Sequence, residues 1–379
     1  MLNIILLGLT SLSTDIASEM VYPLVPFFLT LRLGASPAVL GLIEGVAESL
    51  ASVLKVVAGY LSDRLGDRKR LTIAGYAASA AGKVLLALAT GWSMVLGGRV
   101  VDRLGKGIRT APRDALVADS VRDGRHGHAF GLHRALDTSG AVIGAALAYV
   151  FLTRHAGDYT AVFLWSLVPA ATGVGLLFFV REPTRASRAA VPPSLHWRAL
   201  PPTLQRFLVI AFLFALGNSS NTFLLLRART LGLTTPAVLL RYVAYNVVYA
   251  LASYPAGRLS DRLGRKTVLA GGYALYGLVY AGFARLHDPG QAWALWPLFA
   301  LYGLYAGATD GVERALVVDL APASVRATGL GLHATLLGLG LLPASLVAGQ
   351  LWDHVGPAAV FYLGGAFGLV AAAGLAILL

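Results

Sequence analysis

The sequence predicts an all-α integral membrane protein whose twelve transmembrane helices form two pseudo-symmetric bundles of six. Three observations lead to this fold class: an apolar composition, twelve long apolar blocks and an internal repeat. Of the 379 residues, 56% are hydrophobic and 13% are charged, whereas about 25% of the residues of a soluble domain are charged. Little of the chain lies outside the apolar blocks, so no soluble catalytic domain and no enzymatic activity are expected.

A helix needs roughly 20 predominantly apolar residues to cross a bilayer. Short polar breaks separate the blocks, and the predicted spans are 3–31, 37–61, 70–91, 93–118, 127–152, 158–180, 203–230, 236–258, 267–286, 292–318, 327–351 and 356–379. The first block lacks a basic flank and a small-residue cleavage site. We therefore expect it to be a span and expect no cleavable signal peptide. The chain has no cysteine, which excludes disulfides and thiolate metal sites.

Four short motifs recur about 200 residues apart and divide the chain into related halves. The recurring motifs are "PAVL" at 37–40 and 236–239, "LSDRLG" at 61–66 and 259–264, "ALVAD" at 115–119 with "ALVVD" at 315–319, and "GLH" at 131–133 and 331–333. We predict an N-terminal bundle over 1–180, a cytoplasmic linker over 181–203 and a C-terminal bundle over 204–379. Parallel halves of this kind place the substrate site between them near the membrane midplane.

Basic residues gather in alternate breaks between the predicted spans. The basic breaks are 63–70, 122–128, 181–188 and 257–266. Because Lys and Arg mark cytoplasmic loops, both termini are expected in the cytoplasm of a bacterial-type inner membrane. The net charge of +12 is then a topology signal, and no nucleic-acid partner is expected.

The doubled motif G-x-L-S-D-R-x-G, placed after the second and eighth predicted spans, resembles the loop motif of the major facilitator superfamily. The resemblance covers essentially the whole chain, and the segment 102–120 is also similar to bacterial drug-efflux-like permeases. It implies that ion pairs around the motif latch the outward-facing state. The gating residues are then Gly59, Asp63, Arg64, Gly66, Arg68 and Asp119 in the first half and Gly257, Asp261, Arg262, Gly264, Arg265 and Asp319 in the second.

One departure from the motif concerns its end, where Asp67 occupies the place that Arg265 holds in the second copy. The first-half latch is therefore expected to use Arg68 instead, or to be weaker. The alternative is that both loops only enforce the topology. That alternative explains the cations but leaves the Gly and Asp spacing unexplained.

Ionisable side chains lie inside the first-half spans, where each costs roughly 2.5–3.5 kcal/mol unless it is paired or hydrated. Helical spacing places Asp15 and Glu19 on one face. We expect Asp15 to face Arg109 or Arg113. We expect Glu48 to face Arg134 or Lys83. A carboxylate that is protonated when its arginine withdraws, and charged when the arginine returns, makes a proton switch. The predicted proton-coupling residues are Asp15, Glu19, Glu48, Arg109, Arg113 and Asp137.

The alternative is a purely structural role, in which these charges form ion pairs that hold the bundle together. We favour that alternative for Lys55, Asp102, Arg103 and Asp114, which lie nearer the span ends or beside opposite charges. The second half carries amides, hydroxyls and aromatic side chains at equivalent depth, which suit a ligand or interhelical contacts equally well. The predicted substrate-binding residues are Asp15, Glu44, Lys83, Arg134, Asn218, Asn221, Tyr245, Asn246 and Tyr249.

The sequence thus predicts a secondary transporter that moves a small organic solute, anionic or amphipathic, by proton-coupled alternating access, with export favoured over uptake. It contains no Walker P-loop, so ATP is not expected to drive transport. No cofactor is expected, the proton gradient is the energy source, and the partners are the solute and membrane lipid around a monomer. A second hypothesis is a divalent metal or metal-chelate transporter with Asp15, Glu19 and Glu48 as oxygen ligands. A third is a non-transporting sensor.

Overall fold

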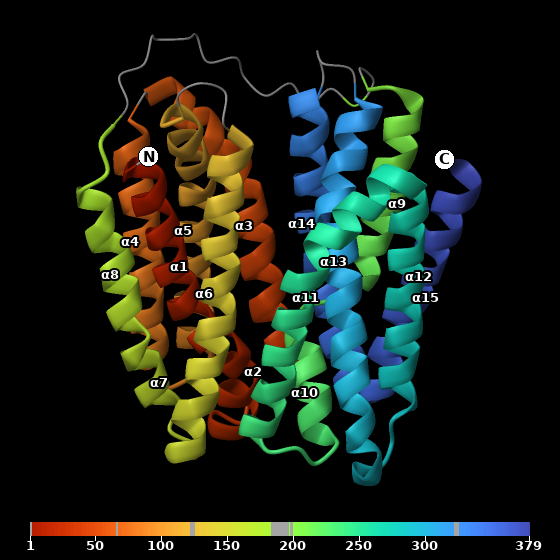
Figure 1. The fold of residues 1–379 in the computed structure, drawn as a ribbon. Coiled ribbons are helices and arrows are strands. Elements are labelled where there is room, and N and C mark those ends of the chain that lie inside the picture. The colour runs from red at the N-terminus through yellow and green to blue at the C-terminus, as the bar shows by residue number, and fades with distance from the viewer. Residues whose placement is uncertain (1, 66, 122–125, 183–196, 198–199, 322–325) are drawn as a thin grey trace. The chain divides into compact units, whose positions relative to one another are not determined.

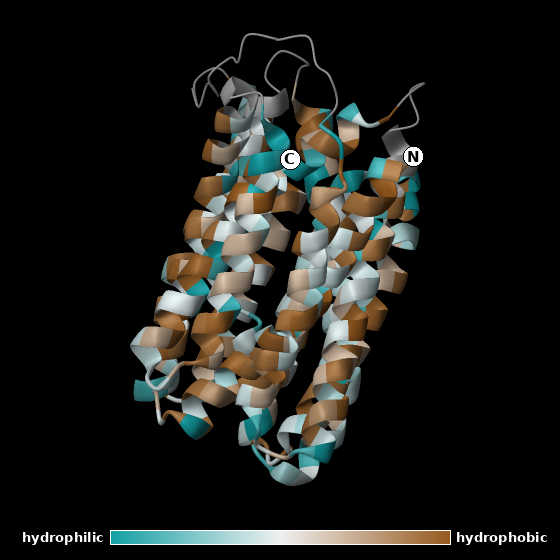
Figure 2. Ribbon diagram, turned by 90° about the vertical axis from the view of Figure 1, so that its left-hand side faces the viewer, coloured by the Kyte–Doolittle hydropathy of each residue, from teal (hydrophilic) through white to brown (hydrophobic). Residues whose placement is uncertain are grey.

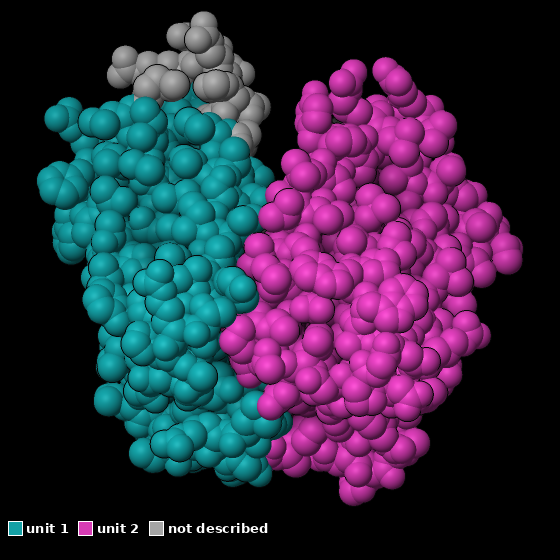
Figure 3. All heavy atoms as spheres, turned by 60° about the horizontal axis from the view of Figure 1, so that its bottom comes forward, with its two compact units in different colours: residues 1–34, 46–192 teal, residues 35–45, 193–379 magenta. Residues whose placement is uncertain are grey.

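The apolar blocks of the sequence fold into helices throughout the described part of the chain in the computed structural model (Figure 1). The structure describes residues 2–65, 67–121, 126–182, 197, 200–321 and 326–379. Within these residues, twelve helical spans follow one another along the chain, as the sequence predicts. The chain divides into two compact units, residues 1–34 with 46–192 and residues 35–45 with 193–379 (Figure 3).

The first unit contains the first six spans, with the beginning of the second span grouped into the other unit. Its first span starts as α1 (Leu2–Val21) and continues through η1 (Tyr22–Leu24), α2 (Val25–Phe27) and η2 (Phe28–Arg32). The irregular stretch after α1 contains Pro23 and Pro26. The other spans are α3 (Pro37–Leu65), α4 (Arg68–Ala87), α5 (Trp92–Asp119), α6 (His126–Arg154) and the pair α7 (Tyr159–Trp165) and α8 (Leu167–Phe178).

The second unit contains the last six spans. Its first span is broken, because four residues separate the end of α9 (Pro202–Gly217) from the start of α10 (Thr222–Thr230). The others are α11 (Thr235–Leu263), α12 (Arg265–Arg285), α13 (Leu295–Leu320) after the short η4 (Pro289–Ala294), α14 (Arg326–His354) and α15 (Pro357–Leu378). Residues 218–221, an amide- and hydroxyl-rich segment, therefore interrupt the first span of this unit.

Equivalent helices pack against each other in both units. In the first unit α1 packs on α6 and α8, and α4 packs on α5 and α8. In the second unit α9 packs on α14 and α15, and α12 packs on α13 and α15. These are the same pairs of spans, counted from the start of each unit. The repeat that is visible in the motifs is thus also present in the helix packing.

Hydrophobic residues run along the helices, whereas hydrophilic residues are concentrated toward the helix ends (Figure 2). Within the described residues, seven helical stretches are long and apolar enough to cross a membrane by themselves. The five spans that do not reach this criterion are α3, α4, α5, α11 and α13. Several of them carry the intramembrane charges noted above, so polar interiors lower their hydropathy.

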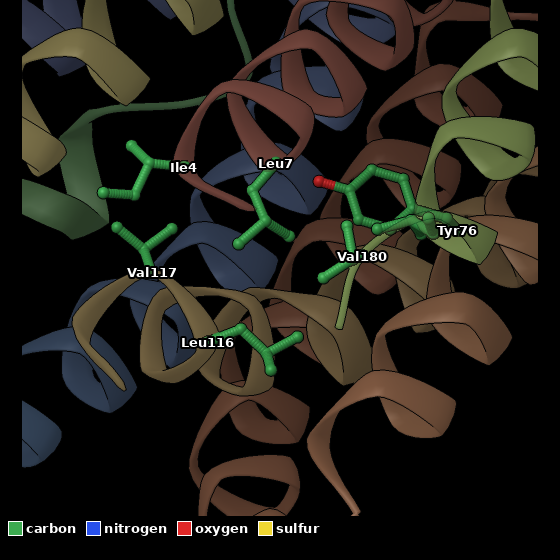
Figure 4. Packing of buried hydrophobic residues seen from close by; sticks show 7 residues of the cluster. Ile4, Leu7, Tyr76, Leu116, Val117 and Val180 are labelled. Carbon is green, nitrogen blue, oxygen red and sulfur yellow. The ribbon is translucent and has the colours of Figure 1, made fainter. Parts of the chain in front are cut away.

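The first unit has an apolar cluster around the start of α1 (Figure 4). Ile4 and Leu7 of α1 pack with Tyr76 of α4, with Leu116 and Val117 of α5, and with Leu177 and Val180 at the end of the sixth span. Each of these side chains is almost completely buried. The cluster fixes four spans of the unit against one another, and it places the charged stretches of α4 and α5 at a defined height beside α1.

Glycines set the close approach of α4 and α5. A Cβ atom on Gly105 of α5 would lie 2.4 Å from the carbonyl oxygen of Gly75, and one on Gly82 of α4 would lie 2.6 Å from that of Gly98. Real side chains do not tolerate such distances, so these positions need glycine. The same contact line brings Lys83 and Arg109 against the partner helix.

We expect Gly105→Ala to lower the thermal unfolding midpoint, because overpacking of a close contact costs about 1–3 kcal/mol. Gly97→Ala is the matched control, since a Cβ there meets no atom within 4 Å on the same helix α5. Thermal unfolding of the purified protein, followed by tryptophan fluorescence, measures both. Equal midpoints for the two variants would show that the α4–α5 contact is not as tight as the structure has it.

Candidate functional site

A buried ion-pair network lies between α4 and α5. Lys83 Nζ is 3.0 Å from Asp102 Oδ1, and these side chains are 1% and 7% exposed. Arg99 and Arg103 flank Asp102 at 3.7 and 3.5 Å. Lys83, a predicted substrate ligand, is thus held by a carboxylate of the same unit. Asp102 and Arg103 behave as the structural ion pairs that the alternative interpretation proposed.

Glu48 of α3 belongs to the same network. Its Oε1 atom lies 2.6 Å from Arg103 Nε and 3.7 Å from Arg99 Nη2. The expectation that Glu48 faces Lys83 or Arg134 is therefore wrong. α4 turns Lys83 toward α5, where Gly82 allows Asp102 to approach closely.

Arg109 of α5 is buried, and it lies within electrostatic range of Asp15. Its Nη1 atom donates to Ser79 Oγ at 2.8 Å, and its guanidinium lies over the Tyr76 ring at 4.3 Å. Among the described residues, no ion pair joins Asp15 to Arg109 or to Arg113. Arg109 is therefore near Asp15, as expected, but does not form an ion pair with it. The Tyr76 ring and Ser79, both on α4, hold Arg109 instead.

Asp15 lies beside a second carboxylate, Asp137 of α6. The two carboxyl groups are within hydrogen-bonding reach of each other. A Cβ on Gly140, one turn along α6, would lie 3.0 Å from the Cβ of Asp15, which explains how the two backbones come so close. Both side chains are half-buried. Glu19 lies one turn further along α1 and packs in the same way against Gly144.

Ser11 connects this carboxylate pair to Arg113. The Ser11 hydroxyl donates to Asp137 Oδ1 at 2.6 Å and accepts from Arg113 Nη1 at 3.2 Å. Arg113 also pairs with Asp114 at 2.8 Å, and Arg134 lies 3.5 Å from Asp137 Oδ2. The structure thus brings together four predicted residues, Asp15, Asp137, Arg113 and Arg134. It adds Ser11, which lies one turn before Asp15 on α1.

The second unit presents aromatic rings where the first presents ions. Tyr280 and Tyr302, at the repeat positions of Lys83 and Asp102, have ring centroids 6.1 Å apart. A small recess lies beside them on α10, α11 and α13; its lining residues are Asn221, Leu224, Leu225, Tyr242, Tyr245, Phe299 and Tyr302. No role was predicted from the sequence for Tyr280 or Tyr302, although the helical spacing of the tyrosines at 276 and 280 is a signal for an aromatic face on this helix.

The predicted second-half ligands have different environments. Tyr302 donates to Asn221 Oδ1 at 2.7 Å, and Tyr245 packs on Tyr302 at 5.4 Å, so these predicted residues do line the recess. Asn246 donates to the Tyr242 carbonyl of its own helix at 3.1 Å, and Tyr249 donates to Asp310 Oδ2 at 3.0 Å. Asn218 is the C-cap of α9 and is not among the lining residues.

Glu44 is completely buried within the second unit, to which residues 35–45 belong. The Ser220 hydroxyl, in the break between α9 and α10, donates to Glu44 Oε2 at 3.3 Å. The Ser220 amide in turn donates to Ser345 Oγ of α14 at 3.2 Å. Glu44 therefore ties the start of α3 to the broken span.

Two of the ion pairs expected around the gating motifs are present, one in each unit. Arg68 pairs with Asp119, and Arg265 pairs with Asp319 at 3.2 Å and with Asp261 at 2.7 Å. The side chains of Asp63 and Arg64, and all of Gly66, lie outside the described residues. Arg262 lies in the last turn of α11, and Gly264 joins α11 to α12 with a φ of +89°.

The alignment of Asp67 with Arg265 needs a correction. Arg68 and Arg265 both begin the third span of their unit, and both pair with the acid that ends or nearly ends the fourth span. Asp67 is an extra residue before α4, where its side chain accepts from the Arg70 amide at 3.1 Å as the helix N-cap. Gly59 does contact Ala111 closely, whereas a Cβ on Gly257 meets no atom within 4 Å.

The two motif pairs differ in burial, and this difference can be measured. Asp119→Asn leaves the buried Arg68 guanidinium with a weaker partner, and we expect a loss of about 1.5–3 kcal/mol of stability. Asp319→Asn removes a more exposed pair whose Arg265 keeps Asp261, so we expect a loss of about 0–1 kcal/mol. The thermal unfolding midpoint should fall further for Asp119→Asn, and the reverse order would contradict the assignment.

Comparison with known proteins gives matches over the whole chain. The family model described as Major Facilitator Superfamily matches residues 7–240 and 207–379. An uncharacterised MFS-type transporter of Methanocaldococcus jannaschii is 37% identical over 376 residues, which cover 97% of this chain and 92% of that protein. Multidrug resistance protein MdtH of Aeromonas hydrophila is 25% identical over 357 residues, or 92% of this chain and 87% of that protein.

Solved structures of the same fold include two transporters. A nucleoside transporter, NupG, has a TM-score of 0.85 at 13% identity and covers 99% of both chains. A peptide transporter, POT, has a TM-score of 0.78 at 15% identity over 99% of this chain and 94% of its own. At such identities these matches show the arrangement of the helices, and they carry no information on the substrate.

Proposed function

Because this chain belongs to the major facilitator superfamily, and is therefore a multi-pass membrane transporter and not an enzyme, we propose that it is a proton-coupled exporter of a small amphipathic organic solute. The observation that carries the proposal is the contact between Asp15 and Asp137 in the first unit. The working unit is a monomer in the inner membrane with both termini in the cytoplasm. It uses the proton gradient and no cofactor.

Proton binding is supported by the chemistry of adjacent carboxyl groups. Two neighbouring negative charges in a poorly hydrated site repel strongly, so the pair holds one proton between its oxygens and titrates as a unit. Arg113 is the cation that can replace this proton. It already reaches Ser11, which donates to Asp137. A shift of Arg113 from Ser11 to Asp137 releases the proton, and its return allows the pair to be protonated again.

An amphipathic solute is supported by the aromatic recess of the second unit. Aromatic faces bind apolar and cationic groups, and the Asn221 amide and tyrosine hydroxyls can orient a polar one. The relative named multidrug resistance protein is consistent with export of such molecules. Lys106, beside the Asp15 carboxylate, can in addition attract an acidic group of the solute.

The divalent-metal alternative has less support. Among the residues that the structure describes, no three His, Asp or Glu side chains gather into a group that could hold a metal ion. Glu48, one of the proposed oxygen ligands, is bound by Arg103 and Arg99. A bare divalent cation next to two arginines is electrostatically unfavourable.

A ligand screen followed by flux measurement tests the proposal. Purified protein is screened by thermal shift against aromatic drugs, organic anions, amino acids, lipids and divalent metals. The compound with the largest shift is then loaded outside proteoliposomes with and without an acidic interior. We expect an amphipathic drug to shift the midpoint and the acidic interior to drive its uptake. A shift by metals alone, or uptake that ignores the pH gradient, would refute the proposal.

A further inference from the structure

Three polar side chains from three different helices meet in the interior of the second unit. Tyr273 of α12 donates its hydroxyl to Glu313 Oε1 of α13 at 3.0 Å. His333 Nε2 of α14 lies 3.4 Å from the other oxygen, Oε2. Tyr273 is completely buried, and the side chains of Glu313 and His333 are 10% and 5% exposed. We call these residues the Tyr273–Glu313–His333 trio.

The trio is enclosed by rings rather than by cations. Phe214 of α9 stacks on Tyr273 with centroids 3.9 Å apart, and Phe207 of α9 stacks on His333 at 5.9 Å. Tyr305, on the same helix as Glu313, is a further titratable group that interacts with Glu313 and Tyr273. From α11, Tyr249 donates to Asp310 and not to Glu313. Within the described residues, no Lys or Arg pairs with Glu313, and Arg314 pairs with Asp310 at 2.9 Å.

The internal repeat supplies a counterpart with the opposite charge. Tyr76, Arg113 and His133 occupy the same repeat positions of the first unit, about 200 residues earlier. Arg113 lies beside Tyr76 and close to His133. An arginine keeps its charge at every physiological pH, so the first-unit counterpart holds a permanent cation. Glu313 in the same place is a group that can gain or lose a proton.

A single proton would neutralise the trio. A carboxylate and a neutral imidazole together carry one negative charge, and isolating that charge in a poorly polarisable interior costs several kcal/mol. One added proton makes the trio neutral, either as a carboxylic acid beside imidazole or as a carboxylate beside imidazolium. The Tyr273 hydroxyl already donates to Oε1, which leaves Oε2, the oxygen next to His333, as the place for the proton.

We propose that the Tyr273–Glu313–His333 trio binds one exchangeable proton and is a second proton site, in the half of the protein opposite to Asp15 and Asp137. The proton moves between Glu313 Oε2 and His333 Nε2: the O–H bond breaks as the N–H bond forms, which leaves a carboxylate and an imidazolium. Phe207 holds the imidazole plane for this transfer. The role of this proton in transport rests on the proposed function, whereas its presence can be measured in the resting protein.

Infrared difference spectroscopy of the purified full-length protein, recorded between two pH values, tests the inference. The carbonyl stretch of a protonated carboxyl group appears or disappears as the group titrates. We expect Glu313→Gln to lose one such band and His333→Gln to move the same band to a different pH. Asp310→Asn, one turn away on α13, is the matched control and should keep the band. Asp15→Asn should keep it as well and lose a separate one.

A Glu313→Gln spectrum identical to that of the unmutated protein would overturn the inference. If that variant fails to fold, histidine-selective nitrogen labelling of the unmutated protein provides the second measurement. The ring signal of His333, identified by its loss in His333→Gln, should titrate with pH, and a signal that stays constant would also overturn the inference. If a pH gradient drives uptake but no band is assigned to Glu313, the second proton site is refuted and the proposed function stands. A Glu313 band without driven uptake refutes the proposed function alone.

Discussion

Asp15→Asn is expected to abolish solute accumulation driven by a pH gradient. With one proton exchanged per solute, a gradient of one pH unit can sustain about a tenfold accumulation, because one unit corresponds to about 1.36 kcal/mol. Asparagine keeps the size and hydrogen bonding of Asp15 beside Asp137 but cannot release a proton. Accumulation in acidic-inside proteoliposomes should therefore fall to the level found without a gradient, whereas exchange of labelled for unlabelled solute continues.

The control for this prediction is Asp158→Asn. Asp158 caps α7 through the Ala161 amide at 3.0 Å, and asparagine caps helices equally well, so this variant should accumulate solute normally. Ser11→Ala should retain coupling in part, because Arg113 and Asp137 remain. Full gradient-driven accumulation by Asp15→Asn would exclude the carboxylate pair as the coupling site, whatever the solute.

Asp102→Ala is expected to cause the largest loss of stability. It leaves Lys83, which is 1% exposed, without the carboxylate that neutralises it. It also removes a carboxylate that lies within ion-pair distance of Arg99 and Arg103. Breaking a buried pair by removing one partner costs about 3–5 kcal/mol. The thermal unfolding midpoint of the purified protein should fall sharply, and the amount of folded protein recovered from membranes should fall with it.

The double variant Lys83→Met with Asp102→Leu is the control. It removes both charges and fills a similar volume, and replacement of a buried ion pair by apolar residues is often neutral or stabilising. We expect its midpoint to lie close to that of the unmutated protein and well above that of Asp102→Ala. If the double variant were as unstable as Asp102→Ala, the loss of stability would not come from an unneutralised Lys83 alone, and this explanation would be contradicted.

The fold could be predicted because the membrane restricts what the chain can form. Twelve apolar blocks must be helices, and the repeated motifs relate the halves, so no tertiary contact was needed for this conclusion. The ion pair between Arg265 and Asp319 was also predictable, since its residues stand at the ends of adjacent spans in each copy. Such predictions depend on position along a helix, which the sequence gives directly.

Partners inside the membrane were harder to predict, because they depend on the rotation of each helix about its axis. Asp15 lies beside another acid, and Glu48 pairs with Arg103, although residue counting favoured other cations at the same depth. Glycine contacts fix those rotations: Gly140 turns α6 toward Asp15, and Gly82 turns α4 toward Asp102. Their effect depends on which helix lies opposite, and one sequence does not show that.

The exchange of an ion pair in the first unit for an aromatic pair in the second has a consequence for how the protein is made. Lys83 lies in α4, which is not apolar enough to cross a membrane by itself, whereas α12, with Tyr280 in the equivalent place, is. A helix with unpaired charges partitions poorly into lipid. We therefore expect α4 and α5 to enter the bilayer together as a hairpin in which Lys83 and Asp102 are paired, whereas α12 is apolar enough to enter alone.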